Sequence, residues 1–437
     1  MNSARETALR LLQEHRKKQS YADLLFKERA ARLDAREAAL CAQLFYGVLQ
    51  NQYKLDYLIA HFSSVPLKKM QHAVWDCLRL GFYQLAYLDG ITPYAAVSET
   101  VTLARKRAGE RAASFVNGVL RAAVRVDTLP EPPHTPFASY LSIEYSQPIW
   151  QIEEYIARLG AEEAHALAKA HNRPAPLWVQ INPAKRQLFW DAVRAQEITA
   201  TPHETIPDCC TLSGAGAIAQ CAAFTQGTFI VADPAARLAV WAAAPKPGET
   251  VLDACAAPGG KTFMTAFSLQ DSGRILAYDQ HAHKILLLQT GVDRLGLTCV
   301  ETASKDAGLY DPTLDAQFDL VIADLPCSGL GVLRKKPDIR FKPQQDADAL
   351  PAIQTRLLTN LARYVRPGGR LLYSTCTLRH AENEQVTAQF LETHPQYASA
   401  PFTLPDPWGS VASGQLTLWP HRDGTDGFYI SLLRRLT

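Results

Sequence analysis

The stretch Thr250–Thr262 reads TVLDACAAPGGKT and decides the fold of the longest part of the chain. It begins with a short apolar run that predicts a β-strand, continues through small residues, and reaches an expected helix start near Lys261. In a strand–loop–helix unit of this kind, backbone N–H groups approach a ligand closely at the helix N-terminus. The stretch therefore predicts a ligand-binding loop in an α/β domain.

Two common phosphate-binding patterns do not fit this loop. A dinucleotide fingerprint requires GxGxxG, whereas only the pair Gly259–Gly260 is present. A P-loop requires glycine five residues before its Gly-Lys-Thr, and that position is Cys255. The loop therefore indicates a different nucleotide-like ligand.

From residue 233 onward, apolar strand-like runs alternate with helical stretches, which is typical of a doubly wound parallel sheet. The expected helices include Ile285–Leu295 and Ala352–Val365, and a third strand is expected around Thr298–Glu301. The other strands are expected at Thr250–Asp253, Arg274–Tyr278, Phe318–Ala323 and Arg370–Ser374.

The 437 residues are too many for one ordinary core, so several domains are expected. Apolar residues at helical spacing predict an all-α bundle over 1–128, followed by a proline-rich linker over 129–139. A small α+β domain is expected over 140–232, and the α/β domain over 233–437. The clearest helical patterns in the bundle are Ala38–Leu49, Val74–Leu88, Ala95–Leu103 and Phe115–Val124.

Charge is unevenly distributed along the chain. Residues 1–130 carry 19 Lys and Arg against 12 Asp and Glu, whereas residues 131–240 carry 7 against 11. A basic N-terminal segment suits a module that faces RNA, although a solvated helical surface explains the same charge.

We expect a cytoplasmic location, since we find no signal peptide and no bilayer-spanning run. The nine scattered cysteines form no CxxC pair, so we expect neither disulfides nor a metal site.

Three aspartates follow predicted strands, where open α/β proteins place their sites. Asp279 ends the second strand, and a carboxylate there can accept the hydroxyls of a bound ribose. Asp306 follows the third strand, where it can contact an adenine amine. Loop aspartates are also common turn formers, so each position alone is a weak indication.

The third aspartate stands beside one of two cysteines that suit one difficult reaction. Asp324-Leu325-Pro326-Cys327 follows a buried-type strand, and Cys376 ends the next one. Carbon 5 of cytosine attacks a methyl donor only weakly, but a thiolate added to carbon 6 makes it nucleophilic. A carboxyl group near N3 and the exocyclic amine, such as Asp324, would stabilise that adduct.

At these residues the chain resembles the Sun family of RNA 5-methylcytosine methyltransferases. The matching stretches are Asp253–Thr262, Asp324–Gly329, Gly331–Arg340 and Tyr373–Thr377. The stretches Leu78–Leu85 and Phe115–Arg121 resemble a NusB-like RNA-binding domain. This combination is similar to the bacterial branch that acts on 16S ribosomal RNA. The resemblance implies a NusB-like bundle, a small RNA-recognition-like middle domain and a Rossmann-like class I methyltransferase domain.

The resemblance also implies a role for each candidate residue. Cys376 is the nucleophile, Cys327 assists elimination and product release, Asp324 contacts the cytosine, and Lys261 lies near the reacting centre. The segment Asp423–Tyr429 is the late hairpin that closes the sheet. S-adenosyl-L-methionine is the cofactor, and its expected contacts are Cys255, Ala256, Ala257, Pro258, Gly259, Gly260, Lys261, Asp279, Asp306 and Asp324. The expected partner is RNA with a single-stranded or flipped-out cytosine, without membrane or metal, and the chain is expected to be a monomer.

Three other functions are alternatives to this one. An amino-group methyltransferase would carry Asn/Asp-Pro-Pro-aromatic after the fourth strand and needs no thiol, whereas this chain has Asp324–Cys327. A non-enzymatic RNA-binding or antitermination factor would need only the NusB-like part. A transfer RNA cytosine methyltransferase is the remaining alternative, since related enzymes modify either RNA.

Overall fold

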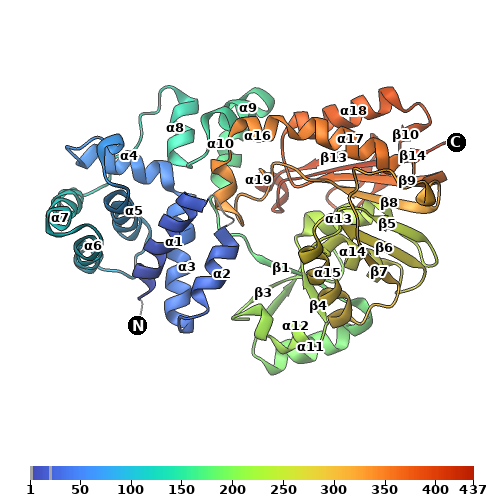
Figure 1. Cartoon of the computed structure of the whole chain (residues 1–437), viewed down its shortest axis with the longest axis horizontal. Helices are drawn as coiled ribbons and strands as arrows, with labels where there is room; N and C mark the ends of the chain where they lie inside the picture. The colour runs from blue at the N-terminus through green and yellow to red at the C-terminus, as the bar shows by residue number, and fades with distance from the viewer. Residues whose placement is uncertain (1–2, 19–21) are drawn as a thin grey trace. The chain divides into compact units, whose positions relative to one another are not determined.

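The computed structural model describes residues 3–18 and 22–437, and the chain divides into two compact units (Figure 1). The helical unit comprises Met1–Arg173 together with Leu333–Lys342. The sheet unit comprises Pro174–Val332 and Pro343–Thr437. The ten-residue segment Leu333–Lys342, from the second half of the chain, therefore folds with the N-terminal helices.

The helical unit contains helices that cover each of the four expected helical patterns, with boundaries shifted by a few residues. The α6 helix begins at Pro93, where Thr92 accepts a hydrogen bond from the Ala95 N–H and the fixed proline φ suits the first turn. The helices of the N-terminal stretch are α1 (Ala4–Lys18), α2 (Ala22–Ala30), α3 (Ala35–Gln50), α4 (Gln52–Phe62), η1 (Leu67–Lys69), α5 (His72–Tyr87), α6 (Pro93–Ala108), α7 (Glu110–Val124), α8 (Phe137–Glu144), α9 (Ile149–Leu159) and α10 (Ala161–Ala170).

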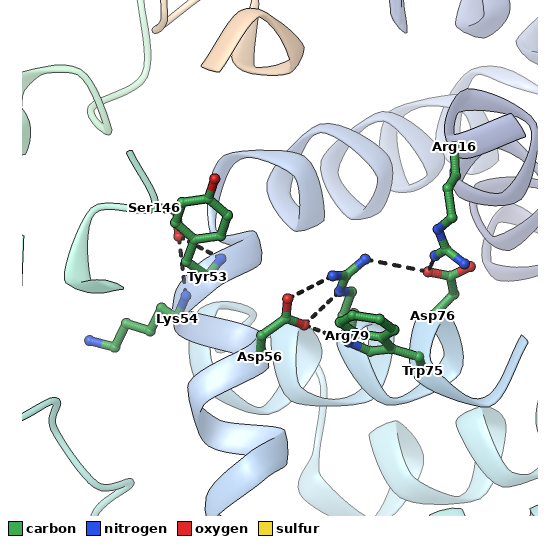
Figure 2. Close-up of polar contacts among 8 residues, drawn as sticks. All are labelled: Arg16, Tyr53, Lys54, Asp56, Trp75, Asp76, Arg79 and Ser146. Carbon is green, nitrogen blue, oxygen red and sulfur yellow. Dashed lines mark hydrogen bonds and ion pairs between the residues drawn. The ribbon is translucent and has the colours of Figure 1, made fainter. Parts of the chain in front are cut away.

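A chain of charged groups links α1, α4 and α5 inside the helical unit (Figure 2). Asp56 accepts hydrogen bonds from Arg79 at 2.7 Å and from the Trp75 indole at 2.6 Å. Arg79 also lies 3.6 Å from Asp76, which pairs with Arg16. Because these charges are partly or fully buried, each depends on its partner to offset the cost of leaving water.

The segment Leu333–Lys342 completes the helical unit. It contains the short helix η5 (Pro337–Phe341), in which Arg340 is 1% exposed. The Arg340 Nη1 donates to the carbonyl oxygens of Gln50 at 2.7 Å and Tyr145 at 3.0 Å, and to Asn172 Oδ1 at 3.1 Å. Burial lowers the pKa of Arg340 to about 10, so the guanidinium still carries its charge at neutral pH.

The sheet unit begins with a small antiparallel sheet in the order β2-β3-β1-β4. The strands β1 and β4 match strand-like runs of the sequence at Leu177–Ile181 and Thr228–Val231, whereas β2 and β3 were not predicted. Its elements are β1 (Leu177–Ile181), η2 (Pro183–Lys185), α11 (Arg186–Ala195), β2 (Thr199–Pro202), β3 (Cys209–Ser213), η3 (Ile218–Gln220), α12 (Ala222–Thr225) and β4 (Phe229–Val231).

The main sheet has the order β10-β14-β9-β8-β5-β6-β7, with β13 paired to β14. The five strands from β7 to β9 are parallel, and β14 runs antiparallel to β9. Its strands are β5 (Thr250–Asp253), β6 (Arg274–Asp279), β7 (Val300–Ser304), β8 (Phe318–Asp324), β9 (Val365–Thr375), β10 (Tyr397–Ser399), β13 (Gln415–Leu418) and β14 (Phe428–Arg435), and β11 (Phe402–Thr403) pairs separately with β12 (Ser410–Val411).

Helices cover both faces of this sheet. Its strands alternate, so that Val251 packs in one apolar cluster and Leu252 in another. The first cluster includes α13 (Pro234–Ala243), α14 (Gly260–Ser268) and α15 (Ala282–Leu295). The second includes α17 (Leu350–Ala362) and α18 (Glu384–Thr393). The remaining short helices are η4 (Pro312–Leu314), α16 (Gln344–Asp348), η6 (His380–Glu382) and α19 (Pro420–Asp423).

Two expectations need correction in detail. The helix expected over Ala352–Val365 ends at Ala362, and Val365 already begins β9. The sheet is mixed, because the closing hairpin β13–β14 adds an antiparallel edge. The segment Asp423–Tyr429 lies at the end of the hairpin connection and the start of β14. The division of the chain into three domains by sequence stays a prediction.

Candidate active site

The loop after β5 has the strand–loop–helix geometry expected of a ligand-binding loop. Its turn is closed by a 2.7 Å hydrogen bond from the Gly259 N–H to the Ala256 carbonyl oxygen. Gly259 has φ of 112°, and a Cβ there would lie 2.3 Å from the Phe263 ring, so this position requires glycine. A Cβ on Gly260 would meet no atom of the described residues within 4 Å. The backbone is therefore open to a ligand at the start of α14.

Asp253, at the end of β5, is buried beneath this loop. The Thr262 hydroxyl donates to its Oδ2 at 2.7 Å. Burial raises the pKa of Asp253 to about 7, and the neighbouring Asp324 charge adds to the rise, whereas the Thr262 hydrogen bond opposes it. The carboxyl group thus titrates near neutral pH.

The candidate ribose and adenine contacts lie at the same edge of the sheet. Asp279 ends β6, is 6% exposed, and accepts the His281 N–H at 3.1 Å. Asp306 follows β7, is exposed, and accepts the Gly308 N–H at 2.8 Å. Since β5, β6 and β7 are parallel neighbours, the structure brings both acids to the edge that carries the loop.

Lys261 and Asp324 form an ion pair that the sequence did not predict. The Lys261 ammonium lies 2.7 Å from Asp324 Oδ2 and 4.8 Å from the centre of the Phe428 ring. The Ser374 hydroxyl donates to the other carboxylate oxygen at 3.0 Å. The Asp324 side chain remains 34% exposed, so the carboxylate is held in place and still open to a polar ligand.

The two candidate thiols meet at the carboxyl ends of β8 and β9. The Sγ atoms of Cys327 and Cys376 are 3.2 Å apart. The contact with Cys376, reinforced by burial, raises the pKa of Cys327 well above its ordinary value. The protonated form of Cys327 is therefore favoured.

The backbone at Cys376 is held by close contacts with the backbone at Gly331 and Gly427. The Gly331 N–H donates to the Cys376 carbonyl oxygen, and the Gly427 N–H donates to the Gly331 carbonyl oxygen, both at 2.9 Å. A Cβ on Gly331 would lie 1.9 Å from the Gly427 oxygen, so only glycine permits this packing.

Sequence reasoning missed the buried polar groups behind the thiols, which include Gln354, Glu382 and Asn383. A signal was present, because two polar residues of one turn, Glu382 and Asn383, follow Cys376 by only a few positions. All nine cysteines lie within the described residues, and none of them forms a disulfide there. In residues 3–18 and 22–437, no cluster of three or more His, Cys, Asp or Glu side chains is arranged to hold a metal.

No helix in the described part of the chain is both long and apolar enough to cross a bilayer.

Comparisons with known proteins agree along the whole chain. Three family models match: one described as 16S rRNA methyltransferase RsmB/F over residues 240–434, the NusB family over 2–125, and an RsmF/B-like ferredoxin-like domain over 147–219. The order of a helical NusB part, a small middle domain and a C-terminal methyltransferase domain is thus confirmed.

Relatives of full length are also found. The chain is 36% identical to a probable ribosomal RNA small subunit methyltransferase B of Bacillus subtilis, covering 99% of both chains. It is 35% identical to the protein of the same description from Synechocystis, covering 100% of both. Among solved structures, the one titled PH0851 matches with a TM-score of 0.79 and 26% identity, over 98% of this chain and 97% of that chain.

Proposed function

The chain belongs to the RsmB/F family of 16S rRNA methyltransferases, and from this premise we propose that it methylates carbon 5 of a cytosine in small-subunit ribosomal RNA. The single observation that carries the proposal is the 3.2 Å separation of the Cys327 and Cys376 sulfurs. A methyltransferase acting on an amine or hydroxyl would need neither thiol. Two thiols at one strand edge suit a reaction in which a sulfur adds to the base and later leaves.

The loop geometry supports S-adenosylmethionine as the methyl donor. The open backbone at Gly260 and the carboxylates that follow β6, β7 and β8 fit a nucleoside with a charged amino-acid tail. The backbone of residues 255–261 would lie against it, Asp279 would accept the ribose hydroxyls, and Asp306 would receive the adenine amine. When bound, the cofactor supplies a methyl group on a positively charged sulfur.

The chain's own residues would activate the cytosine. The Cys376 thiolate forms a bond to carbon 6, and the electron pair of the 5,6 double bond becomes available at carbon 5. Asp324, held by Lys261 and Ser374, would accept a hydrogen bond from the exocyclic amine of the ring. Because the thiolate must reach the ring face, the target base has to be unstacked.

Release reverses the first step. After carbon 5 carries the methyl group, it loses its proton to a base, the double bond re-forms, and the bond between carbon 6 and the Cys376 sulfur breaks. Cys327, whose raised pKa keeps it protonated, would donate its S–H to the departing sulfur. The roles of the two cysteines are therefore distinct: one adds, and the other assists departure.

The test compares Cys376→Ala with Cys327→Ala on 16S rRNA and on transfer RNA. Cys376→Ala should abolish methylation, because no bond to carbon 6 can form. Cys327→Ala should accumulate an RNA–protein adduct that survives a denaturing gel, because elimination stalls. Near-normal methylation by Cys376→Ala would overturn the mechanism, and a preference for transfer RNA would overturn the substrate. Bisulfite sequencing of the product would identify the position of the methyl group.

A further inference from the structure

Behind the two thiols lies a carboxylate to which the proposed reaction gives no role. Glu382 is 0% exposed and ends the short helix η6, six residues after Cys376. Its Oε2 accepts two hydrogen bonds, from the Ser328 N–H at 2.9 Å and from the Gln354 side-chain amide at 3.0 Å. Its Oε1 has no hydrogen-bond partner within the described residues. A buried carboxylate with one unpartnered oxygen is costly, so packing alone does not account for it.

Glu382 and Gln354 together hold the backbone on both sides of Cys327. The Gln354 amide also donates to the Pro326 carbonyl oxygen at 2.9 Å, and Gln354 is 0% exposed. The peptide group before Cys327 is thus bound by Gln354, and the N–H after it is bound by Glu382. This double attachment fixes the path of the chain that carries the Cys327 sulfur.

A second set of contacts connects this loop to the Cys376 loop. The Ser328 and Thr377 hydroxyls are 2.7 Å apart, so the residues that follow the two cysteines are joined directly. Asn383, next to Glu382, donates to the Thr377 carbonyl oxygen at 2.9 Å and accepts from the Thr375 hydroxyl at 2.5 Å. One short turn therefore holds both cysteine loops through adjacent side chains.

We propose that Glu382 is a positioning residue for Cys327, which sets the separation of the two sulfurs through the Ser328 N–H and Gln354. This inference rests on the proposed function, because it assigns Glu382 to the release step. The side-chain hydrogen bonds of Glu382 go to Ser328 and Gln354, so it acts by holding the Cys327 loop. Its negative charge, which favours the protonated form of Cys327, supports the same role.

The structure predicts different outcomes for two substitutions. Glu382→Gln keeps an oxygen that can accept both hydrogen bonds and removes only the charge. Glu382→Ala removes the acceptor, so the Ser328 N–H and the Gln354 amide lose their partner and the loop is free to shift. Because a displacement of about 1 Å can change a rate by roughly 100-fold, Glu382→Ala should slow product release by about 10- to 100-fold.

The experiment measures a single turnover, multiple turnovers and the adduct on a denaturing gel, using the full chain and 16S rRNA. Glu382→Ala should form the adduct at a near-normal rate and clear it slowly, while Glu382→Gln clears most of it. Gln354→Ala leaves the hydrogen bond between Glu382 and Ser328 in place, so it should delay clearance of the adduct less. It replaces Glu382→Ala in the test if that variant does not fold. Glu249→Ala is the structural control, since Glu249 pairs with Arg370 away from the thiols; it should destabilise the protein without delaying release.

Cys327→Ala in parallel separates this inference from the proposed function. If Cys327→Ala traps the adduct but Glu382→Ala and Gln354→Ala both clear it at the normal rate, the positioning role is wrong and the mechanism stands. If Cys327→Ala traps no adduct, the proposed release step itself fails. If Glu382→Ala slows adduct formation and release equally, Glu382 supports the whole site and has no specific role at Cys327.

Discussion

The Lys261 ammonium and the Asp324 carboxylate lie 2.7 Å apart, joining the first turn of α14 to the carboxyl end of β8. This pair fixes a carboxylate whose side chain is 34% exposed, beside two thiols. In the proposed reaction, Asp324 would therefore present a fixed oxygen to the base without rearranging when the substrate arrives.

Replacing Lys261 with methionine should lower the methylation kcat by about 10- to 100-fold, because Asp324 would lose the contact that orients it. Arg274→Met is the control. Arg274 is 51% exposed and its partner Glu301 is 55% exposed, and such surface pairs contribute only about 0–1 kcal/mol. Equal effects of the two substitutions on kcat would show that the Lys261 pair has no special role.

Asp253 should make stability depend on pH. The pKa of its carboxyl group is about 7 in the folded chain and about 4 when unfolded. Between these values the unfolded state has lost the proton that the folded state keeps. The stability contributed is therefore fully present below about pH 4 and is lost as pH rises through 7.

Asp253→Asn removes this dependence and can still accept the Thr262 hydrogen bond. The melting temperatures of the two proteins are measured between pH 4.5 and 7.5. As pH rises, the melting temperature of Asp253→Asn should increase relative to that of the unsubstituted protein. Parallel curves over that range would contradict the raised pKa of the buried carboxyl group.

Arg340→Met should destabilise the helical unit, because three partly buried acceptors lose a charged donor. Hydrogen bonds to charged groups contribute about 1.5–3 kcal/mol, which corresponds to roughly 3–12 °C in the melting temperature of a unit of this size. Arg186→Met is the control, since Arg186 is 56% exposed in its pair with Asp208. An unchanged melting transition for Arg340→Met would refute the role assigned to the buried guanidinium.

RNA binding by the full chain should weaken as salt concentration rises, since residues 1–130 carry a net charge of +7, from 19 basic and 12 acidic residues. Replacing the exposed Arg111, Arg121 and Arg125 with alanine should make binding less sensitive to salt. The slope of the logarithm of the binding constant against the logarithm of salt concentration should become shallower by about one for each lost phosphate contact. Arg274→Ala, which breaks an exposed pair with Glu301, should leave the slope unchanged. A slope that is equally steep in the triple variant would place the RNA contacts elsewhere.

The sequence predicted the parts of the fold that have a local cause. The strands around Val251 and Val321 are continuous apolar runs, and the edge where Asp279 and Cys376 lie follows from strand direction alone. β2 and β3 were missed because Thr199–Pro202 and Cys209–Ser213 lack such runs.

The pairings within the site could not be predicted in the same way. Lys261 forms an ion pair with Asp324, which lies 63 positions later in the chain. Glu382 accepts a hydrogen bond from Ser328, which lies 54 positions earlier. These partners are set by how the strands and helices pack, and no local pattern encodes them. The attachment of Leu333–Lys342 to the helical unit has the same origin.

The place of Arg340 in the chain has a consequence for biosynthesis. Ribosomes add about 5–20 residues per second, so translation of the 167 residues from Pro174 to Arg340 takes on the order of 10–30 s. Throughout that interval the nascent N-terminal helices lack the guanidinium that donates to the carbonyl oxygens of Gln50 and Tyr145. The first part to leave the ribosome is thus finished only when a much later stretch of polypeptide reaches it.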